Sequence, residues 1–256
     1  MQIIDAHCHY GPGEGFSGPW DTSASLEKYL QWAQEAGIDK TIVFPAFHTD
    51  YQKANRWLAK RVPKHQGKLF AFAFIHPKRD KNRVKLMLDE VVRKYGFVGI
   101  KVHRYDGVIS REICEAAKWY RIPVLYDVMG DVHTVELIAR EYPSVNFIIP
   151  HLGSFADNWK DQLNFIPILI RHHNVYTDTS GVRRFELLEM AVKEAGAHKV
   201  IFGSDGPWLH PGVELAKIYA LKLLPLAERQ ILGGNILKLI TKNQKPYARA
   251  QTRTYL

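Results

Sequence analysis

Short apolar segments alternate along the chain with longer segments in which apolar residues recur at helical spacing. The short segments are rich in β-branched and aromatic residues, a composition typical of buried strands. The predicted strands are Ile3–His7, Thr41–Phe47, Leu69–His76, Phe97–His103, Ile122–Val128, Asn146–Pro150, Val175–Thr179 and Val200–Ser204. The predicted helices are Ser25–Ala36, Arg79–Tyr95, Arg111–Tyr120, Val132–Tyr142, Asp161–His172, Arg183–Ala195, Pro211–Leu223 and Leu226–Ile240.

This alternation predicts an α/β fold, a (β/α)8 TIM barrel. Successive strands start 24–38 residues apart, which leaves room for one strand and one covering helix in each unit. No Gly-x-Gly-x-x-Gly motif follows the first strand, which argues against a dinucleotide-binding sheet. No linker divides the chain, so we expect residues 1–256 to form one barrel domain with C-terminal helices and a short basic tail. The Gly-rich segment Gly11–Gly18 is expected to form a mobile loop over the barrel mouth.

The composition limits the kinds of molecule that the protein is expected to bind. Lys and Arg number 35 and Asp and Glu 26, which gives a net charge of +9. The basic residues are dispersed, a pattern that argues against a nucleic-acid surface and is compatible with an anionic small-molecule substrate. Two cysteines are too few for a disulfide framework, and no segment resembles a signal peptide or a membrane span. We therefore expect a cytoplasmic protein that binds neither nucleic acid nor membrane, with a homodimer as one option for its oligomeric state.

Polar residues gather at the ends of the predicted strands, where TIM barrels carry their active sites. The first strand runs into Asp5-Ala6-His7-Cys8-His9, and strand alternation places Asp5, His7 and His9 on one side. Later strands end in further imidazoles, carboxylates and an amine. These are His76, Lys101, His103, Asp127, His151 and Asp205. Imidazoles and carboxylates that converge on one end of a barrel are typical ligands of a divalent metal ion, so the pattern predicts a metal site.

Seven sequence blocks tie the chain to a known family. They are IDAHCH near the start, GFVGIKVH at residues 96–103, IPVLYD at 122–127, FIIPHLGS at 147–154, NVYTDTSG at 174–181, VIFGSDGPW at 200–208 and ILGGNILKLI at 231–240. In these blocks and their order the chain resembles the amidohydrolase superfamily, and within it the amidohydrolase-related group that includes aminocarboxymuconate semialdehyde decarboxylase. The resemblance extends over nearly the whole chain and implies the same barrel fold.

The resemblance also implies a site and an activity. By matching motif, His7, His9 and Asp205 would be ligands of one divalent ion, with zinc favoured and manganese as the alternative. His151, in PHLG, matches the histidine that orients or deprotonates the metal-bound water, and Asp205 is a second candidate to move its proton. The implied reaction is attack by metal-bound hydroxide on the carbonyl of a lactone, amide or cyclic ester in a small anionic substrate.

One position departs from the family pattern. The family has Pro-Val-x-x-His at its fifth strand, whereas here Asp127 stands in the place of the histidine. If Asp127 is the fourth ligand, two His and two Asp make a harder site, which favours manganese more than a His-rich site does. Three alternatives stay open: His103 replaces the missing ligand, Asp127 contacts only the substrate, or the site has lost its metal.

Four residues are candidates to bind the substrate. Lys101 and His103 end the fourth predicted strand, and Lys101 is expected to balance a substrate carboxylate or a nearby Asp. A carboxylated Lys101 that bridges two metals is the less favoured alternative. Trp208 is expected to form part of an aromatic wall. Arg183 is a candidate to clamp a carboxylate.

Two further function classes compete with hydrolysis. The same ligands serve non-oxidative decarboxylases, in which the metal binds the substrate and no water attacks. The other alternative is a barrel without catalytic activity that lost its metal through Asp127 and now binds a ligand.

Overall fold

The computed structural model describes residues 2–16, 18, 21–65, 67–156 and 158–241. The basic tail expected at the end of the chain falls on residues 242–256 and lies outside these ranges. Within them, no helix combines the length and the apolar character needed to cross a lipid bilayer.

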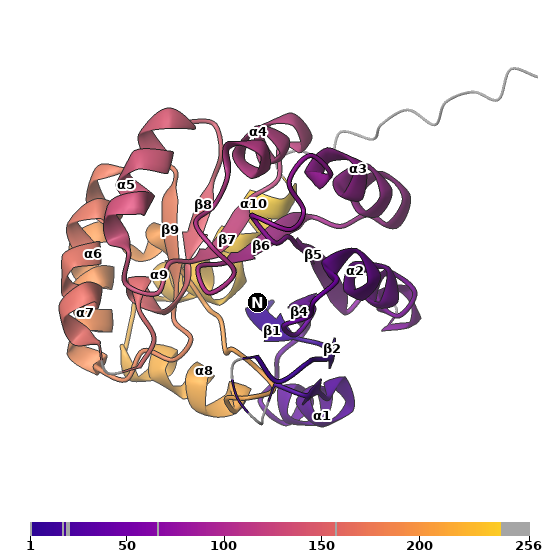
Figure 1. Ribbon diagram of the computed structural model, residues 1–256. Helices are drawn as coiled ribbons and strands as arrows, with labels where there is room; N and C mark the ends of the chain where they lie inside the picture. Colours follow the sequence, from indigo (N-terminus) through magenta and orange to yellow (C-terminus); the bar gives the residue numbers. More distant parts are fainter. Residues whose placement is uncertain (1, 17, 19–20, 66, 157, 242–256) are drawn as a thin grey trace, which may run out of the picture.

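Eight parallel strands stand side by side in chain order around one axis, with the helices outside them, so the predicted (β/α)8 barrel is confirmed (Figure 1). The strands are β1 (Ile4–His9), β4 (Lys40–Phe44), β5 (Leu69–Phe74), β6 (Gly99–His103), β7 (Val124–Asp127), β8 (Phe147–Ile149), β9 (Val175–Asp178) and β10 (Val200–Ile201). Backbone hydrogen bonds join the first strand to the last segment of the ring: Ala6 N–H donates to Phe202 O at 3.0 Å, and His9 N–H donates to Gly206 O at 2.7 Å. These bonds close the barrel.

Helices follow the strands and cover the outside of the ring, whereas the last two of the chain lie behind the strands in the view of Figure 1. They are α1 (Leu26–Glu35), α2 (Tyr51–Ala59), α3 (Val84–Leu88), α4 (Arg111–Tyr120), α5 (Val132–Glu141), α6 (Trp159–Arg171), α7 (Phe185–Ala195), α8 (Pro211–Ala220), α9 (Pro225–Arg229) and α10 (Asn235–Thr241). Two π-helical segments, Asp89–Lys94 and Gln230–Gly234, continue α3 and join α9 to α10. A short antiparallel pair, β2 (Gly11–Pro12) and β3 (Ser23–Ala24), brackets most of the segment predicted as a loop.

Two helix predictions need correction. No helix was predicted between the second and third strands, where the structure has α2. The helix predicted over Arg79–Tyr95 is wrong in its first five residues, because α3 begins only at Val84. Asn82 there adopts a left-handed φ of 65°, which interrupts a right-handed helix.

The strands that carry the candidate site are buried on both sides. Every residue of β1, β7 and β8 is buried, as expected for strands with helices outside and packed side chains inside. Asp5 on β1 accepts hydrogen bonds from the Tyr29 hydroxyl (2.7 Å), His7 N–H (3.0 Å) and Ser204 N–H (2.9 Å). Burial raises the pKa of Asp5 to about 6, and these hydrogen bonds offset part of the rise. Asp5 therefore links β1, α1 and the segment after β10 just below the site.

Asn55 on α2 holds the end of β5 in place. The paired residues of β4 and β5 end at Val43 and Ala71, so Phe74 has no partner on β4. Asn55 takes that place: its Nδ2 donates to Phe74 O at 2.8 Å, and its Oδ1 accepts from Phe74 N–H at 2.9 Å. Asn55 and Phe74 are both buried, so no water can substitute.

Replacing Asn55 with alanine should therefore lower the free energy of unfolding by about 2–4 kcal/mol, because two buried backbone groups lose their partners. Urea denaturation followed by circular dichroism measures this loss. As a control, Gln31→Ala removes an amide from the exposed face of α1, where its bond to Glu35 is open to water, and should cost less than about 0.5 kcal/mol. An equal loss in the two variants would contradict the role assigned to Asn55.

Candidate active site and metal centre

A cavity of about 440 Å³ opens at the carboxyl ends of the barrel strands. Its lining comprises His7, His9, Phe47, Lys101, His103, Asp127, Met129, His151, Ser154, Phe155, Asn158, Asp205 and Trp208. Of the site and strand-end residues named in the sequence analysis, all but Asp5, His76 and Arg183 are among them. Arg183 is exposed and lies two residues before α7, outside this lining. Five further lining residues were not predicted, because nothing in their local sequence pattern marks them as cavity residues: Phe47, Met129, Ser154, Phe155 and Asn158.

His7, His9 and Asp205 form a compact buried cluster within the cavity. One potential ligand atom of each lies within 4.8 Å of those of the other two. Oδ1 of Asp205 lies 3.3 Å from His7 Nε2 and 3.4 Å from His9 Nε2. The side chains come from opposite ends of the chain, β1 and the segment after β10, which the closure of the barrel brings together.

The partners of the other ring nitrogens fix how the two imidazoles are protonated. His7 Nδ1 lies 2.8 Å from Asp178 Oδ2, and His9 Nδ1 lies 3.2 Å from Pro45 O. Both partners are acceptors, so each Nδ1 carries the proton and each Nε2 presents a lone pair to Asp205. Burial lowers the pKa of His9 to about 3 and also lowers that of His7, which keeps both rings in this neutral form.

This arrangement fits a divalent cation. Two imidazole lone pairs and a carboxylate oxygen face one another without a proton between them, so a cation at their centre would relieve the repulsion. Ligand atoms about 2.0–2.2 Å from a tetrahedral ion lie about 3.3–3.6 Å from one another, close to the two separations observed. The Nδ1 contacts to Asp178 and Pro45 are of the kind that orient metal-binding histidines.

The carboxylate of Asp127 faces two histidines that do not belong to the cluster of His7, His9 and Asp205. Its Oδ2 lies 3.0 Å from His103 Nε2 and 3.4 Å from His151 Nε2. Burial alone would raise the pKa of Asp127, but these two histidines outweigh it and hold the pKa well below its usual range. Among the described residues, the compact cluster contains His7, His9 and Asp205 without Asp127. Its role as fourth ligand, and that of His103 as a substitute, stay predictions.

His151 stands between acceptors on both sides. Its Nε2 faces Asp127 Oδ2 at 3.4 Å, and its Nδ1 faces the carbonyl oxygen of Ser180 at 2.7 Å. Burial alone would lower the pKa of His151, but the carboxylates of Asp127, Asp178 and Asp205 raise it to about 9. The geometry and the charges therefore agree on an imidazolium with a proton on each nitrogen.

Asp178, at the end of β9, is a site residue that the sequence analysis missed. One of its oxygens accepts from His7 Nδ1, and the other accepts from His151 N–H at 3.2 Å and from the Ser180 hydroxyl at 2.6 Å. Burial would raise the pKa of Asp178, but His7 above all lowers it to about 2. Asp178 thus positions both an expected ligand and an expected catalytic residue. The block NVYTDTSG contains it, and its place at a strand end was the available signal.

The backbone is strained at two of these residues. His151 and Asp205 both have a φ of 59°, in the left-handed region that costs an L-residue about 1–2 kcal/mol. Such strain persists only where the surrounding structure enforces it, and it concentrates at functional sites.

Lys101, His103 and Trp208 also line the cavity. Lys101 is 1% exposed, and its Nζ lies 3.4 Å from His7 Nε2. The ring of Trp208 packs on that of His9, with 4.0 Å between centroids, and the edge of Phe47 meets His103 at 4.8 Å. The site thus combines aromatic side chains on one part of its lining with imidazoles, carboxylates and an amine on the rest.

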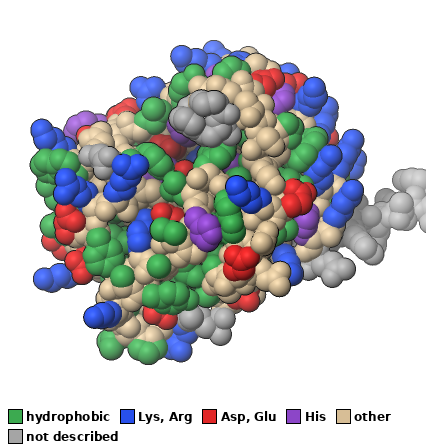
Figure 2. All heavy atoms as spheres, turned by 90° about the horizontal axis from the view of Figure 1, so that it is seen from below, with side chains coloured by type: hydrophobic (Ala, Val, Ile, Leu, Met, Phe, Trp, Pro, Cys, Tyr) green, Lys and Arg blue, Asp and Glu red, His purple; other side chains and the backbone are tan. Residues whose placement is uncertain are grey.

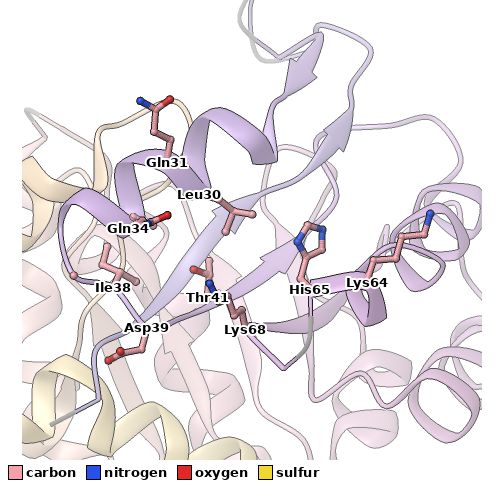
Figure 3. Close-up of a pocket in the computed structure, with 11 residues that line it drawn as sticks. Leu30, Gln31, Gln34, Ile38, Asp39, Thr41, Lys64, His65 and Lys68 are labelled. Atoms are coloured by element: carbon pink, nitrogen blue, oxygen red, sulfur yellow. The ribbon is translucent and has the colours of Figure 1, made fainter.

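A larger cavity, of about 750 Å³, lies elsewhere in the barrel, between α1 and the residues Lys64, His65 and Lys68 (Figure 3). It opens near Asp39 and Thr41, at the amino end of β4, the end of a TIM barrel that does not carry its active site. Asp39 there accepts a hydrogen bond from Ile3 N–H, a structural contact between neighbouring strands. On the face shown in Figure 2, Lys and Arg side chains are scattered and interspersed with acidic ones. Neither the larger cavity nor the scattered basic side chains are as good a candidate for the functional site as the cavity that holds His7, His9 and Asp205.

Comparisons with known proteins agree with this fold. No protein of curated function matches the sequence. Among solved structures, dihydroxybenzoic acid decarboxylase from a Polaromonas species, determined with bound manganese and the inhibitor 2-nitroresorcinol, is similar at a TM-score of 0.72 and 18% identity, covering 95% of this chain and 98% of its own. A candidate 2-pyrone-4,6-dicarboxylic acid hydrolase from Pseudomonas putida is similar at 0.73 and 17%, covering 94% and 97%. An amidohydrolase from Burkholderia multivorans is similar at 0.79 and 13%, covering 94% and 99%.

At these identities the structural likenesses establish the fold alone. The sequence itself goes further, because the family model described as amidohydrolase matches residues 4–241, nearly the whole chain. That range begins at β1, with its two cavity histidines, and extends beyond Asp205 to α10. The resemblance noted in the sequence is thereby confirmed, and the chain belongs to the amidohydrolase family of enzymes.

Proposed function

We propose that the protein is a divalent-metal-dependent decarboxylase of a small ring carboxylate. The observation that carries this proposal is the environment of His151, whose two nitrogens face Asp127 and the Ser180 carbonyl. The carboxylate and the carbonyl only accept, and the Ser180 hydroxyl, 3.0 Å from Nδ1, donates its own proton to Asp178, so the ring holds two protons and is suited to give one away. Decarboxylation needs such a donor, since the carbon that loses CO₂ must gain a proton.

The cavity lining supports a flat anionic substrate. Lys101 brings a positive charge, and Phe47 and Trp208 supply aromatic surface beside it. A divalent ion held by His7, His9 and Asp205 would supply a Lewis acid that polarises a substrate oxygen. Two nitrogens and a carboxylate suit zinc and manganese alike, and the Polaromonas decarboxylase carries manganese.

The proposed reaction balances without a further reactant. The bond between the ring carbon and the carboxylate carbon breaks, and its electron pair stays on the ring carbon. A proton from His151 forms the new C–H bond, CO₂ leaves, and solvent returns a proton to the imidazole. Asp127 and Asp178 stay ionised throughout and stabilise the imidazolium before the transfer.

Hydrolysis of a lactone, amide or cyclic ester is the second candidate. The observation that favours it is Asp205, an ionised carboxylate at the cavity wall with a side chain 12% exposed, placed to accept a proton from water. The Pseudomonas putida relative is described as a hydrolase of a pyrone ring, which gives this candidate a defined test substrate.

One experiment separates the two candidates. The protein, loaded with manganese or zinc, is incubated in D₂O with 2,6-dihydroxybenzoate and related hydroxybenzoates, and separately with 2-pyrone-4,6-dicarboxylate. Decarboxylation releases CO₂ and leaves one deuterium on the ring carbon, which NMR and mass spectrometry detect. Hydrolysis instead opens the pyrone ring and adds the mass of water. Turnover of the pyrone without CO₂ release would replace the decarboxylase proposal with the hydrolase one.

A further inference from the structure

Lys101 is a buried cation at the point where an ion would bind. It lies on β6, is 1% exposed, and its Nζ lies 3.4 Å from His7 Nε2 and 4.9 Å from the centroid of the Phe44 ring. Among the described residues it forms no ion pair with a carboxylate. Burial lowers the pKa of Lys101, and the charges of Asp127, Asp205 and Asp178 oppose this shift from further away. A lysine buried to this degree without a direct carboxylate partner needs an explanation.

The contact with His7 uses the lone pair that a metal ion requires. His7 Nδ1 carries the ring proton, because it faces Asp178 Oδ2 at 2.8 Å. His7 Nε2 therefore has a single in-plane lone pair, and Lys101 Nζ lies within reach to donate to it. One imidazole lone pair cannot accept a lysine N–H and bind a metal ion at the same time.

Charge adds to this conflict. The cluster needs a cation among its facing acceptors, and the Lys101 ammonium lies 3.4 Å from one of them, His7 Nε2. A divalent ion that arrives beside it would meet a like charge in a buried site, where water screens the repulsion poorly. Either the ammonium or the ion can occupy the position next to His7, but each disfavours the other.

We propose that Lys101 is a built-in competitor of the divalent ion: its ammonium occupies the His7 Nε2 lone pair in the metal-free protein and moves toward the cavity when the ion binds. There it would meet the anionic group of the substrate, so that metal binding prepares the anion site. This inference rests on the metal site proposed above. It predicts that the chain binds its metal more weakly than the ligands alone would allow.

The test measures affinity for Zn²⁺ and for Mn²⁺ alone, by titration against a chelator of known affinity, in the wild-type chain and in Lys101→Met and Lys101→Gln. Both substitutions keep a side chain of similar length and remove the charge, and thermal unfolding checks that each variant folds. We expect Kd to fall on the order of tenfold or more in both, because a buried like charge is removed. Lys118→Met, which removes a lysine from the exposed side of α4, should leave Kd within about twofold.

The outcomes separate the inference from the proposed function. Tighter binding in both Lys101 variants, or binding in the variants where the wild-type chain binds nothing, supports the competition. If the wild-type chain binds the ion and both variants bind it equally well or more weakly, the competition is overturned and the metal site stands. If both variants lose binding altogether, Lys101 is part of the ligand set. No binding by any of the proteins overturns both the inference and the metal-dependent function.

Discussion

Replacing Asp205 with asparagine should abolish tight binding of the divalent ion and lower kcat/KM by about 10³-fold or more, since a bound ion contributes several kcal/mol to the transition state. The reason is local. Oδ1 of Asp205 faces both His7 Nε2 and His9 Nε2, at 3.3 and 3.4 Å. Asparagine keeps the shape but removes the negative charge, and it can turn an N–H toward the two lone pairs.

Metal content per chain and steady-state kinetics measure this effect together. Asp106→Asn is the matched control, because Asp106 is also a shielded carboxylate near the cavity, with a side chain 6% exposed and the Tyr51 hydroxyl as donor, but it does not line the cavity. That variant should retain its metal. Full metal content in Asp205→Asn would mean that the cluster is not the binding site.

Replacing His151 with glutamine should lower kcat by about 10²–10⁴-fold while metal affinity changes by less than about threefold. Glutamine can still donate one hydrogen bond to Asp127 or to the Ser180 carbonyl, but it cannot carry a transferable proton. The effect should appear in kcat rather than in KM, because the proton is needed only in the chemical step.

His103→Gln is the comparison for this variant. His103 contacts the same Asp127 oxygen at 3.0 Å, but its Nδ1 accepts a hydrogen bond from Tyr105 N–H, whereas both nitrogens of His151 face acceptors. Its loss should act mainly on KM. A wild-type kcat in His151→Gln would remove His151 from the chemistry, and a parallel loss of metal would make it a ligand.

The sequence predicted the barrel because each strand and its helix carry a local pattern that the final packing preserves. His7 and His9 could be assigned to one face because strand alternation is a property of the backbone itself. Helix α2 escaped prediction because its buried face is formed largely by Tyr51, Ala54, Asn55 and Leu58, too few large apolar residues to stand out. The start of α3 was placed too early because the left-handed Asn82 has no counterpart in a hydrophobic pattern.

At the site, a position at the end of a strand predicted which side chains lie close together. It did not predict which of them contact one another directly. Asp127 was expected beside the metal ligands, and it does line the cavity, yet its oxygen faces His103 and His151. Which side chains the Asp127 carboxylate contacts depends on distances across the barrel, and these cannot be derived from the spacing of residues along the chain. Asp178 illustrates the same limit, since its partners His7 and His151 are 171 and 27 residues away.

The most direct test of the account is elemental analysis of the wild-type chain, purified without chelator and then reconstituted with zinc or manganese. The account predicts about one equivalent of divalent ion per chain, lost in Asp205→Asn and retained in Asp106→Asn. A wild-type chain that binds no ion even after reconstitution would contradict it. The facing lone pairs of His7, His9 and Asp205 would then need another cation, and neither metal-dependent reaction could stand.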